Sequence, residues 1–95
     1  MGSPAVRLGD VNSGGGATMA GSTKVTVNGR ELVYFGASVA AHPCCGAPGC
    51  GRHCLASTTG GSSKVTVEGK KVIRVGDADS CGDVRFVGSP NVVIG

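Results

Sequence analysis

The sequence predicts a small all-β protein in which short β-hairpins surround one axis with pseudo-threefold symmetry. Three observations predict this fold class: an internal repeat, a period-two alternation of valine with polar residues, and the glycine content. The 95 residues include 18 glycines and only three aromatic residues, which fits many tight turns between short strands better than a packed helical core. A chain of this length forms one domain, residues 1–95, with a thin core that a metal or a disulfide would reinforce.

The repeat is carried by two nine-residue stretches. GSTKVTVNG (21–29) and GSSKVTVEG (61–69) agree at seven positions. A third copy is divided between the chain ends: GSPNVVIG (88–95) matches its first half, and VRLGD (6–10), which aligns with IRVGD (73–77), matches its second half. The N- and C-terminal strands are therefore expected to pair and complete one repeat, a closure that removes exposed sheet edges.

Each complete copy is predicted to be a strand, a tight turn and a second strand. Lys-Val-Thr-Val alternates with the period of two that a half-buried strand requires. Asn28-Gly29 is a strong hairpin-turn signal, and Glu68-Gly69 stands at the same place. The strands are expected at 24–27, 32–35, 64–67 and 72–75. The turns and both termini should lie at one end of the molecule, and the connecting loops at the other.

Charge does not indicate a nucleic-acid partner. The net charge of +3 comes from scattered Lys and Arg residues, which is typical of a solvated surface. Two sets of equivalent positions in the three copies are expected to face outward: Lys24, Lys64 and Asn91, and Arg7, Tyr34 and Arg74.

The connecting loops differ in length, and the longest has an unusual composition. Gly21 lies 12 positions after Gly9, and Gly88 lies 12 positions after Gly76, but the middle loop, residues 37–60, is longer by 13. It contains AHPCCGAPGCGRHC (41–54), which holds four of the five cysteines and both histidines. An insertion confined to one loop of a repeated framework is commonly where special chemistry lies.

These residue types favour a structural zinc site. Thiolates and imidazoles are the donors of tetrahedral Zn²⁺, and the candidates are His42, Cys44, Cys45, Cys50, His53, Cys54 and Cys81. Cys50 and His53 form a C-x-x-H pair, Cys81 would join the last copy to the middle one, and His42 is a natural fourth ligand. Disulfides and free thiols are the alternatives, and the odd number of cysteines in a protein expected in the reducing cytosol weighs against disulfides.

Catalysis, secretion and membrane insertion find no support in the sequence. There is no metalloprotease His-Glu pairing and no phosphate-binding loop, and Asp79 and Asp83 are the only acidic residues that flank a candidate ligand. The N-terminus lacks a signal-peptide core, and no apolar stretch approaches the roughly 18 residues of a membrane span. The chain is expected to be a soluble, non-enzymatic protein.

The blocks VRLGD, GSTKVTVNG, GSSKVTVEGKKVIRVGD and GSPNVVIG together resemble the PAAR-repeat proteins, the spike tips of type VI secretion systems, phage tails and related contractile injection machines. The resemblance implies a zinc-stapled cone seated on a trimeric β-helical spike, a valine-glycine-repeat protein or its phage counterpart, with one tip per trimer. It implies metal ligands within Cys50-Gly51-Arg52-His53-Cys54 and at Cys81. Many members carry a histidine after the first G-D, where this chain has Ser13 and Gly14, so His42 or a thiol of the middle loop should replace it.

The function implied by the resemblance is mechanical. The tip would sharpen the spike for piercing a target envelope, touching the target membrane in transit, with effectors as further cargo. Assembly would occur in the cytoplasm and delivery outside the cell or into the target. Two other classes stay open: a small zinc-binding module for nucleic acid or protein, and a disulfide-stapled extracellular toxin.

Overall fold

In the computed structural model, which describes residues 3–42, 45–46, 48–49 and 51–94, the chain is built from two-residue strands. In the part of the chain so described, the single helical element is one 3₁₀ turn, and no helix is long and apolar enough to cross a membrane. The elements in chain order are β1 (Ser3–Pro4), β2 (Thr26–Val27), β3 (Arg30–Glu31), β4 (Ser38–Val39), η1 (Gly51–His53), β5 (Ala56–Ser57), β6 (Thr66–Val67), β7 (Lys70–Lys71) and β8 (Val93–Ile94).

The two complete repeats form hairpins with the predicted turns. Their second strands lie directly after the turns, at Arg30–Glu31 and Lys70–Lys71, and not at 32–35 and 72–75 as expected. β2 pairs antiparallel with β3, and β6 pairs antiparallel with β7 in the same register. Both turns place two consecutive residues at positive φ: Asn28 at 55° and Gly29 at 80°, Glu68 at 52° and Gly69 at 78°. This is the turn whose twist matches that of the flanking strands, so the second repeat keeps it although glutamate tolerates positive φ less well than asparagine.

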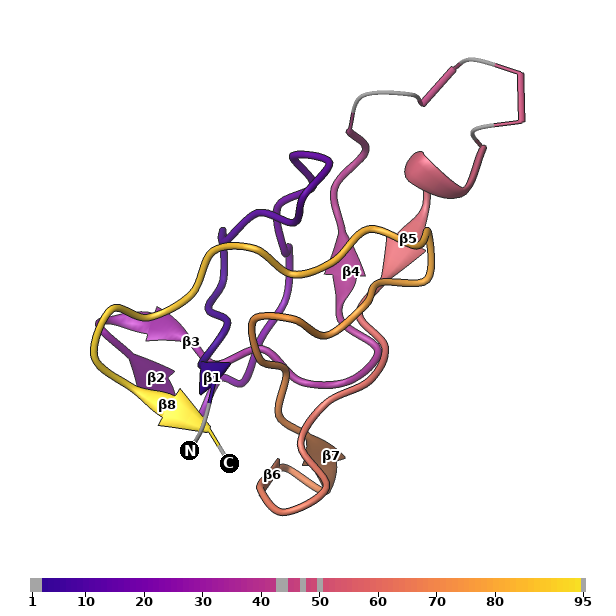
Figure 1. The fold of residues 1–95 in the computed structure, drawn as a ribbon. Helices are drawn as coiled ribbons and strands as arrows, with labels where there is room; N and C mark the ends of the chain where they lie inside the picture. Colours follow the sequence, from indigo (N-terminus) through magenta and orange to yellow (C-terminus); the bar gives the residue numbers. More distant parts are fainter. Residues whose placement is uncertain (1–2, 43–44, 47, 50, 95) are drawn as a thin grey trace.

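The third hairpin is made by the two ends of the chain. β1 pairs antiparallel with β8, with Ser3 opposite Ile94 and Pro4 opposite Val93. The two termini consequently lie together at the end of the molecule that also carries the hairpin turns, and the connecting loops lie at the opposite end (Figure 1). The predicted all-β fold with pseudo-threefold symmetry is confirmed.

Backbone hydrogen bonds close the three hairpins into a ring. The Val6 amide donates to the Ile73 carbonyl at 3.2 Å, the Ile73 amide to the Val33 carbonyl at 3.0 Å, and the Val33 amide to the Val6 carbonyl at 3.0 Å. These residues occupy equivalent places in the three copies. Each copy therefore bonds to the other two, and the three copies form a continuous ring although they belong to one chain.

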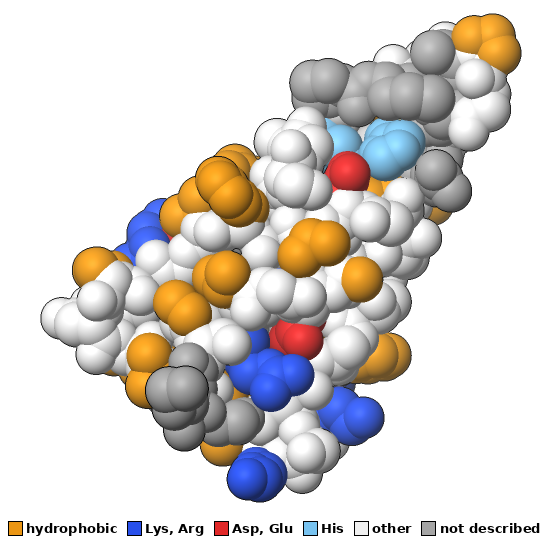
Figure 2. Space-filling model, viewed as in Figure 1, with side chains coloured by type: hydrophobic (Ala, Val, Ile, Leu, Met, Phe, Trp, Pro, Cys, Tyr) orange, Lys and Arg blue, Asp and Glu red, His pale blue; other side chains and the backbone are white. Residues whose placement is uncertain are grey.

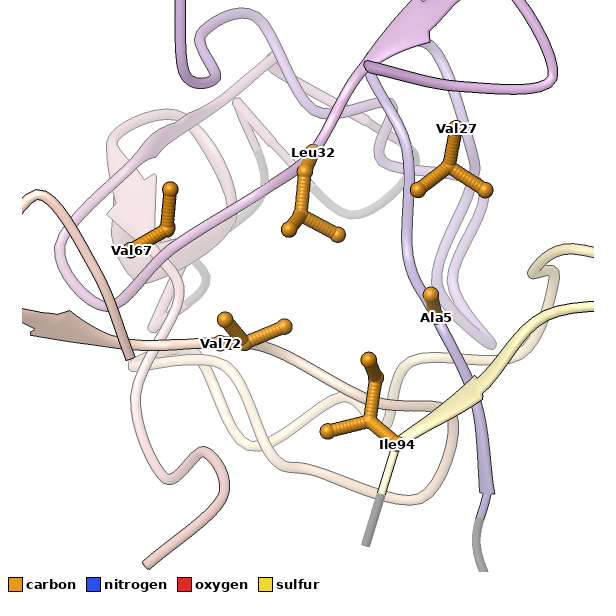
Figure 3. Packing of buried hydrophobic residues seen from close by; sticks show 6 residues of the cluster. All are labelled: Ala5, Val27, Leu32, Val67, Val72 and Ile94. Atoms are coloured by element: carbon orange, nitrogen blue, oxygen red, sulfur yellow. The ribbon is translucent and has the colours of Figure 1, made fainter. Parts of the chain in front are cut away.

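The apolar core follows the same symmetry. Figure 3 shows its first layer, to which each hairpin contributes two side chains around the axis. This layer consists of Ala5, Val27, Leu32, Val67, Val72 and Ile94. A second layer consists of Val6, Val33, Ala37 and Ile73. Both layers are made of small aliphatic side chains because three backbones crowd one axis, which leaves little volume for a larger group.

Serine side chains fasten each hairpin at its entry and link it to the next. The Ser22 hydroxyl accepts hydrogen bonds from the amides two and three residues on and donates to Glu68 at 2.5 Å. The Ser89 hydroxyl accepts in the same way and donates to Asn28 at 2.6 Å. Because Glu68 and Asn28 are the turn residues of neighbouring hairpins, both turns are held by a serine of another copy.

The prediction that Arg7 faces outward is wrong. Arg7 is buried, and its amide and guanidinium Nε donate to the Asp10 carboxylate at 2.8 and 3.0 Å. Arg74 meets Asp77 in the same way but is partly exposed. Alternation along a strand cannot reveal this, because the aspartate that turns the arginine inward lies three residues later, beyond the strand.

Above the apolar layers the core becomes polar. The loops at 9–21 and 76–88 are themselves small hairpins, and together with β4 and β5 they pack around the same axis. Between them lies a fully buried ion pair, Arg85 Nη2 to Asp79 Oδ2 at 2.9 Å, and Asn12 donates to the same carboxylate oxygen at 2.7 Å. Burial lowers the pKa of Arg85 and raises the pKa of Asp79, in both cases against the charged form.

The molecule measures 38 × 26 × 22 Å. Figure 2 shows that it narrows from an end rich in Lys and Arg to an end where both histidines lie beside an acidic side chain.

Candidate metal centre

The middle loop forms an extension that reaches beyond the other two (Figure 1). It is opened by β4 and closed by β5, which pair Ser38 with Ser57 and Val39 with Ala56. We call residues 40–55 the apical loop. One backbone hydrogen bond continues the pairing into it, from the His42 amide to the His53 carbonyl at 3.1 Å. This contact sets the two histidines side by side.

Four side chains from two loops meet near the narrow end. His42 and His53 come from the apical loop, and Cys81 and Asp83 come from the last loop. One donor atom of each lies within 4.8 Å of all the others. His42 and Cys81 are buried, and His53 and Asp83 are partly buried, so the cluster is a shielded group of N, O and S donors.

The distances between these donors suit one tetrahedral ion. The His42 Nε2 atom lies 2.9 Å from His53 Nδ1 and 2.9 Å from Asp83 Oδ2, and His53 Nδ1 lies 3.2 Å from the same oxygen. The Cys81 Sγ atom lies 3.7 Å from His42 Nε2 and 3.5 Å from Asp83 Oδ2. Zinc bonds of roughly 2.0–2.3 Å separate neighbouring tetrahedral ligand atoms by about 3.3–3.6 Å, so the cluster fits the ion with small adjustments.

The tautomer of His42 supports the same conclusion. Its Nδ1 lies 2.9 Å from the Ala40 carbonyl oxygen, and because a carbonyl only accepts, Nδ1 carries the hydrogen. In a neutral ring the Nε2 lone pair then points at a carboxylate oxygen of Asp83, an arrangement that a proton or a cation must bridge. A histidine that binds a metal through one nitrogen usually donates from the other to a backbone carbonyl in this way.

The pKa values of Cys81 and Asp83 are shifted in opposite directions. Burial raises the pKa of the Cys81 thiol above its ordinary value. Partial burial also acts to raise the pKa of Asp83, but hydrogen bonds with Cys81 and His42 and the charge of His53 outweigh it, so the Asp83 pKa is lowered. Near neutral pH the site therefore offers an ionised carboxylate and a thiol that loses its proton when a metal binds.

Of the four predicted ligands, His42, His53 and Cys81 are brought together, and Cys50 lies outside the described residues. Metal binding by this set stays a prediction. Asp83 is not one of the predicted ligands, although it lies two residues after Cys81 and is one of the two acidic residues that flank it. The available signal was that spacing: in a turn, residues two apart can direct their side chains to one point.

Cys45 and Cys54 form a disulfide, with Cα atoms 4.8 Å apart. The expectation that the cysteines of this segment are metal ligands or free thiols is therefore wrong for these two. A protein of the reducing cytosol is expected to keep its thiols reduced, whereas the backbone of the apical loop returns on itself and brings the two residues within bonding reach. Among the described cysteines, Cys81 is free and buried.

The first loop explains why His42 can enter the site. Gly14 and Gly16 stand 67 residues before Cys81 and Asp83, at the equivalent positions of the first copy. A Cβ atom at Gly14 would collide with the Asp83 carboxylate, and one at Gly16 would lie 2.7 Å from His42 Nδ1. Because both positions of the first loop are glycine, no side chain of that loop fills the space beside Asp83, and the imidazole of His42 occupies it. His42 is one of the residues expected to replace the histidine missing after the first G-D, and its role as a ligand stays a prediction.

The geometry agrees with the comparison to protein families. The model of the PAAR motif matches residues 8–85, which is most of the chain. A search of curated proteins found no significant match. The matched region begins at Leu8, between β1 and β2, and ends at Arg85, and it contains the two complete hairpins and all four residues of the candidate metal centre. The chain belongs to the PAAR-motif family, a structural spike-tip motif of contractile injection systems and not an enzyme family.

Proposed function

We propose that this protein caps the blunt end of a trimeric β-helical spike, one tip per trimer, and sharpens it for piercing a target envelope. The observation that carries the proposal is the closed ring of backbone hydrogen bonds between Val6, Val33 and Ile73. A single chain that closes with threefold symmetry offers nearly the same contact surface to each of three identical subunits. The proposed setting is assembly in the cytoplasm and delivery on the injected spike, with effectors carried alongside.

The wide end is the surface proposed to meet the spike. It holds the three hairpins β1–β8, β2–β3 and β6–β7, whose turns and chain ends all lie there (Figure 1). The aliphatic layer directly behind them is itself threefold symmetric (Figure 3). A rigid, symmetric base is the feature that a symmetric partner can use, because contacts made by one hairpin can be repeated by the others.

The narrow end is proposed to hold a structural Zn²⁺ through His42, His53, Cys81 and Asp83. When bound, the ion would supply a strong cross-link between the apical loop and the last loop. The chain's own contribution is orientation: Ala40 holds His42 by its Nδ1 hydrogen, and the short spacing between Cys81 and Asp83 aims both at one point. Structural zinc can contribute on the order of 10 kcal/mol to folding, which suits a point that must resist force.

The proposal is tested by mixing the full chain with a trimeric spike fragment and measuring the mass of the complex by light scattering after size exclusion. One tip per three spike chains supports it. No complex, or a different ratio, contradicts it. Nucleic acid serves as the comparison ligand: salt-sensitive binding to nucleic acid with none to the spike would favour the small zinc-binding interaction module instead.

The metal is tested separately by elemental analysis of the purified protein. One zinc per chain is expected, and Cys81→Ser or His53→Ala should lose it and lower the melting temperature together. Ser63→Ala, at an exposed position of the base, is the matched control and should change neither. Full zinc content in both ligand variants would refute the assigned ligands without affecting the spike proposal.

A further inference from the structure

The disulfide lies directly beside the candidate metal centre. Cys45 follows His42 by three residues and Cys54 follows His53 by one. The Cys45 amide donates to the His42 carbonyl at 3.0 Å, so the first cysteine and the first histidine share one turn. The disulfide thus joins the same two chain segments that supply the two nitrogen donors.

Few other contacts hold those segments together. The β4–β5 pairing ends at Val39 and Ala56. Beyond it, among the described residues of the apical loop, the backbone hydrogen bond from His42 to His53 is the one that crosses between the two arms. Both cysteines are exposed, which leaves the disulfide accessible to soluble thiols. The spacing of the two imidazoles therefore depends on this hydrogen bond, the disulfide and the contacts that both rings make with Asp83.

We infer that the Cys45–Cys54 disulfide is a redox-controlled strap that sets the metal affinity of the tip. With the disulfide closed, His42 and His53 are already held near their binding positions, so less conformational entropy is lost when a metal binds. With it open, the apical loop must be ordered by the metal alone. This inference rests on the proposed metal centre, and it adds a regulation of that centre by the redox state of its surroundings.

The opening reaction is ordinary thiol–disulfide exchange. A thiolate of a dithiol reductant attacks one sulfur, forming a mixed disulfide and releasing the other cysteine as a thiolate. The second thiol of the reductant then displaces the remaining cysteine. Two electrons pass from the dithiol, which ends as its own disulfide, and Cys45 and Cys54 each take up a proton to end as thiols.

Coupling between the two sites must act in both directions. If closing the disulfide raises zinc affinity by some factor, zinc must shift the equilibrium of reduction by the same factor. Couplings between sites in proteins typically amount to about 5–150-fold. A tip assembled in a reducing compartment would therefore hold its metal less tightly than one in oxidising surroundings.

The experiment uses the full chain with Cys44→Ser and Cys50→Ser, so that within the apical loop only Cys45 and Cys54 respond to reductant. Zinc affinity is measured by chelator competition with the disulfide closed, as checked by mass spectrometry, and after opening by a phosphine that does not bind zinc. The closed form should bind at least about fivefold more tightly. Adding Cys45→Ser and Cys54→Ser gives the matched control, which should match the opened form and ignore the reductant.

Equal affinities in the closed and opened forms, or tighter binding after opening, would overturn the inference. The second result would mean that the released thiols act as ligands. The reciprocal measurement is the ratio of oxidised to reduced dithiol at half-opening, which should shift with saturating zinc by the same factor as the affinity. No zinc in either form would overturn the metal centre and the strap together. Spike binding, measured on the same samples, should be unchanged throughout, because the spike is proposed to meet the opposite end.

Discussion

The base and the tip of this molecule use one symmetry in two different ways. At the base, the hairpins β2–β3, β6–β7 and β1–β8 are nearly interchangeable, and their core is made of aliphatic side chains. At the tip, the three loops begin with an equivalent antiparallel pairing, but the middle loop is longer, and the side chains differ: glycines in the first, histidines in the second, and Cys81 with Asp83 in the third. The difference shows that the same backbone ring can carry connecting loops whose side chains have different roles.

The two regions also obtain their cohesion from different interactions. Aliphatic packing is non-directional and tolerates similar side chains at equivalent positions. A buried ion pair such as Arg85 with Asp79, or a metal centre, depends on a few atoms in defined places. Single substitutions should therefore do more damage at the tip than their volume would suggest, and the predictions below test this from the largest expected effect to the smallest.

The largest effect is expected from the buried ion pair. Arg85→Met leaves the Asp79 carboxylate buried without its cation, and breaking such a pair costs about 3–5 kcal/mol. The double variant Arg85→Met, Asp79→Leu should recover a large part of this loss because no isolated charge remains. Denaturant unfolding of both variants measures the difference. A double variant less stable than the single one would show that Asp79 stabilises the fold through its other contacts, such as the hydrogen bond from Asn12.

The next largest effect is expected from filling the space that the glycines of the first loop leave beside Asp83. Gly14→Ala should displace the Asp83 carboxylate, because the new Cβ would overlap it. Displacing a ligand should weaken zinc binding by at least the roughly 10–100-fold that loss of a ligand's hydrogen-bond partner costs, measured by chelator competition. Gly51→Ala is the control, since a Cβ there meets no atom within 4 Å. Unchanged affinity in Gly14→Ala would remove Asp83 from the ligand set.

Acidity should weaken the metal centre in a predictable direction. The Cys81 pKa is raised, so at pH values below it zinc must displace the thiol proton, and affinity should rise about tenfold per pH unit. The lowered pKa of Asp83 means that this carboxylate is already ionised and releases no proton there. Zinc affinities at about pH 7.5 and 8.5 test the slope. Residual zinc binding by Cys81→Ser should have a flat profile over this range.

The smallest effect compares two equivalent positions of the base. Ser22→Ala and Ser89→Ala each remove a hydroxyl that accepts from two amides and holds the turn of a neighbouring hairpin. Each should cost about 1 kcal/mol, and the two costs should be similar because the contacts are. Thermal unfolding gives the values, with exposed Thr23→Ala as the control. A large difference between the two serines would show that equivalent hydrogen bonds of the base contribute unequally to the free energy of unfolding.

Much of the base could be predicted from the amino-acid sequence, because its information is local and repeated. The alternation in each copy predicts the strands, and Asn28-Gly29 predicts the turn, since both residues tolerate positive φ. The split third copy predicts that the chain ends meet, because half a hairpin leaves a sheet edge that the other half can fill. The excess length and composition of the middle loop predict where the special chemistry lies.

The arrangement of the tip could not be predicted in the same way, because it depends on distances between loops that residue spacing along the chain does not determine. Asp83 joins His42, Gly14 makes room for both, and Cys45 pairs with Cys54 only because loops far apart in sequence converge on one axis. The inward turn of Arg7 toward Asp10 has the same origin. Periodic patterns report which face a residue occupies. Which residue it contacts on that face depends on differences of a few ångströms in the distances between loops. The folded ring of hairpins sets those distances.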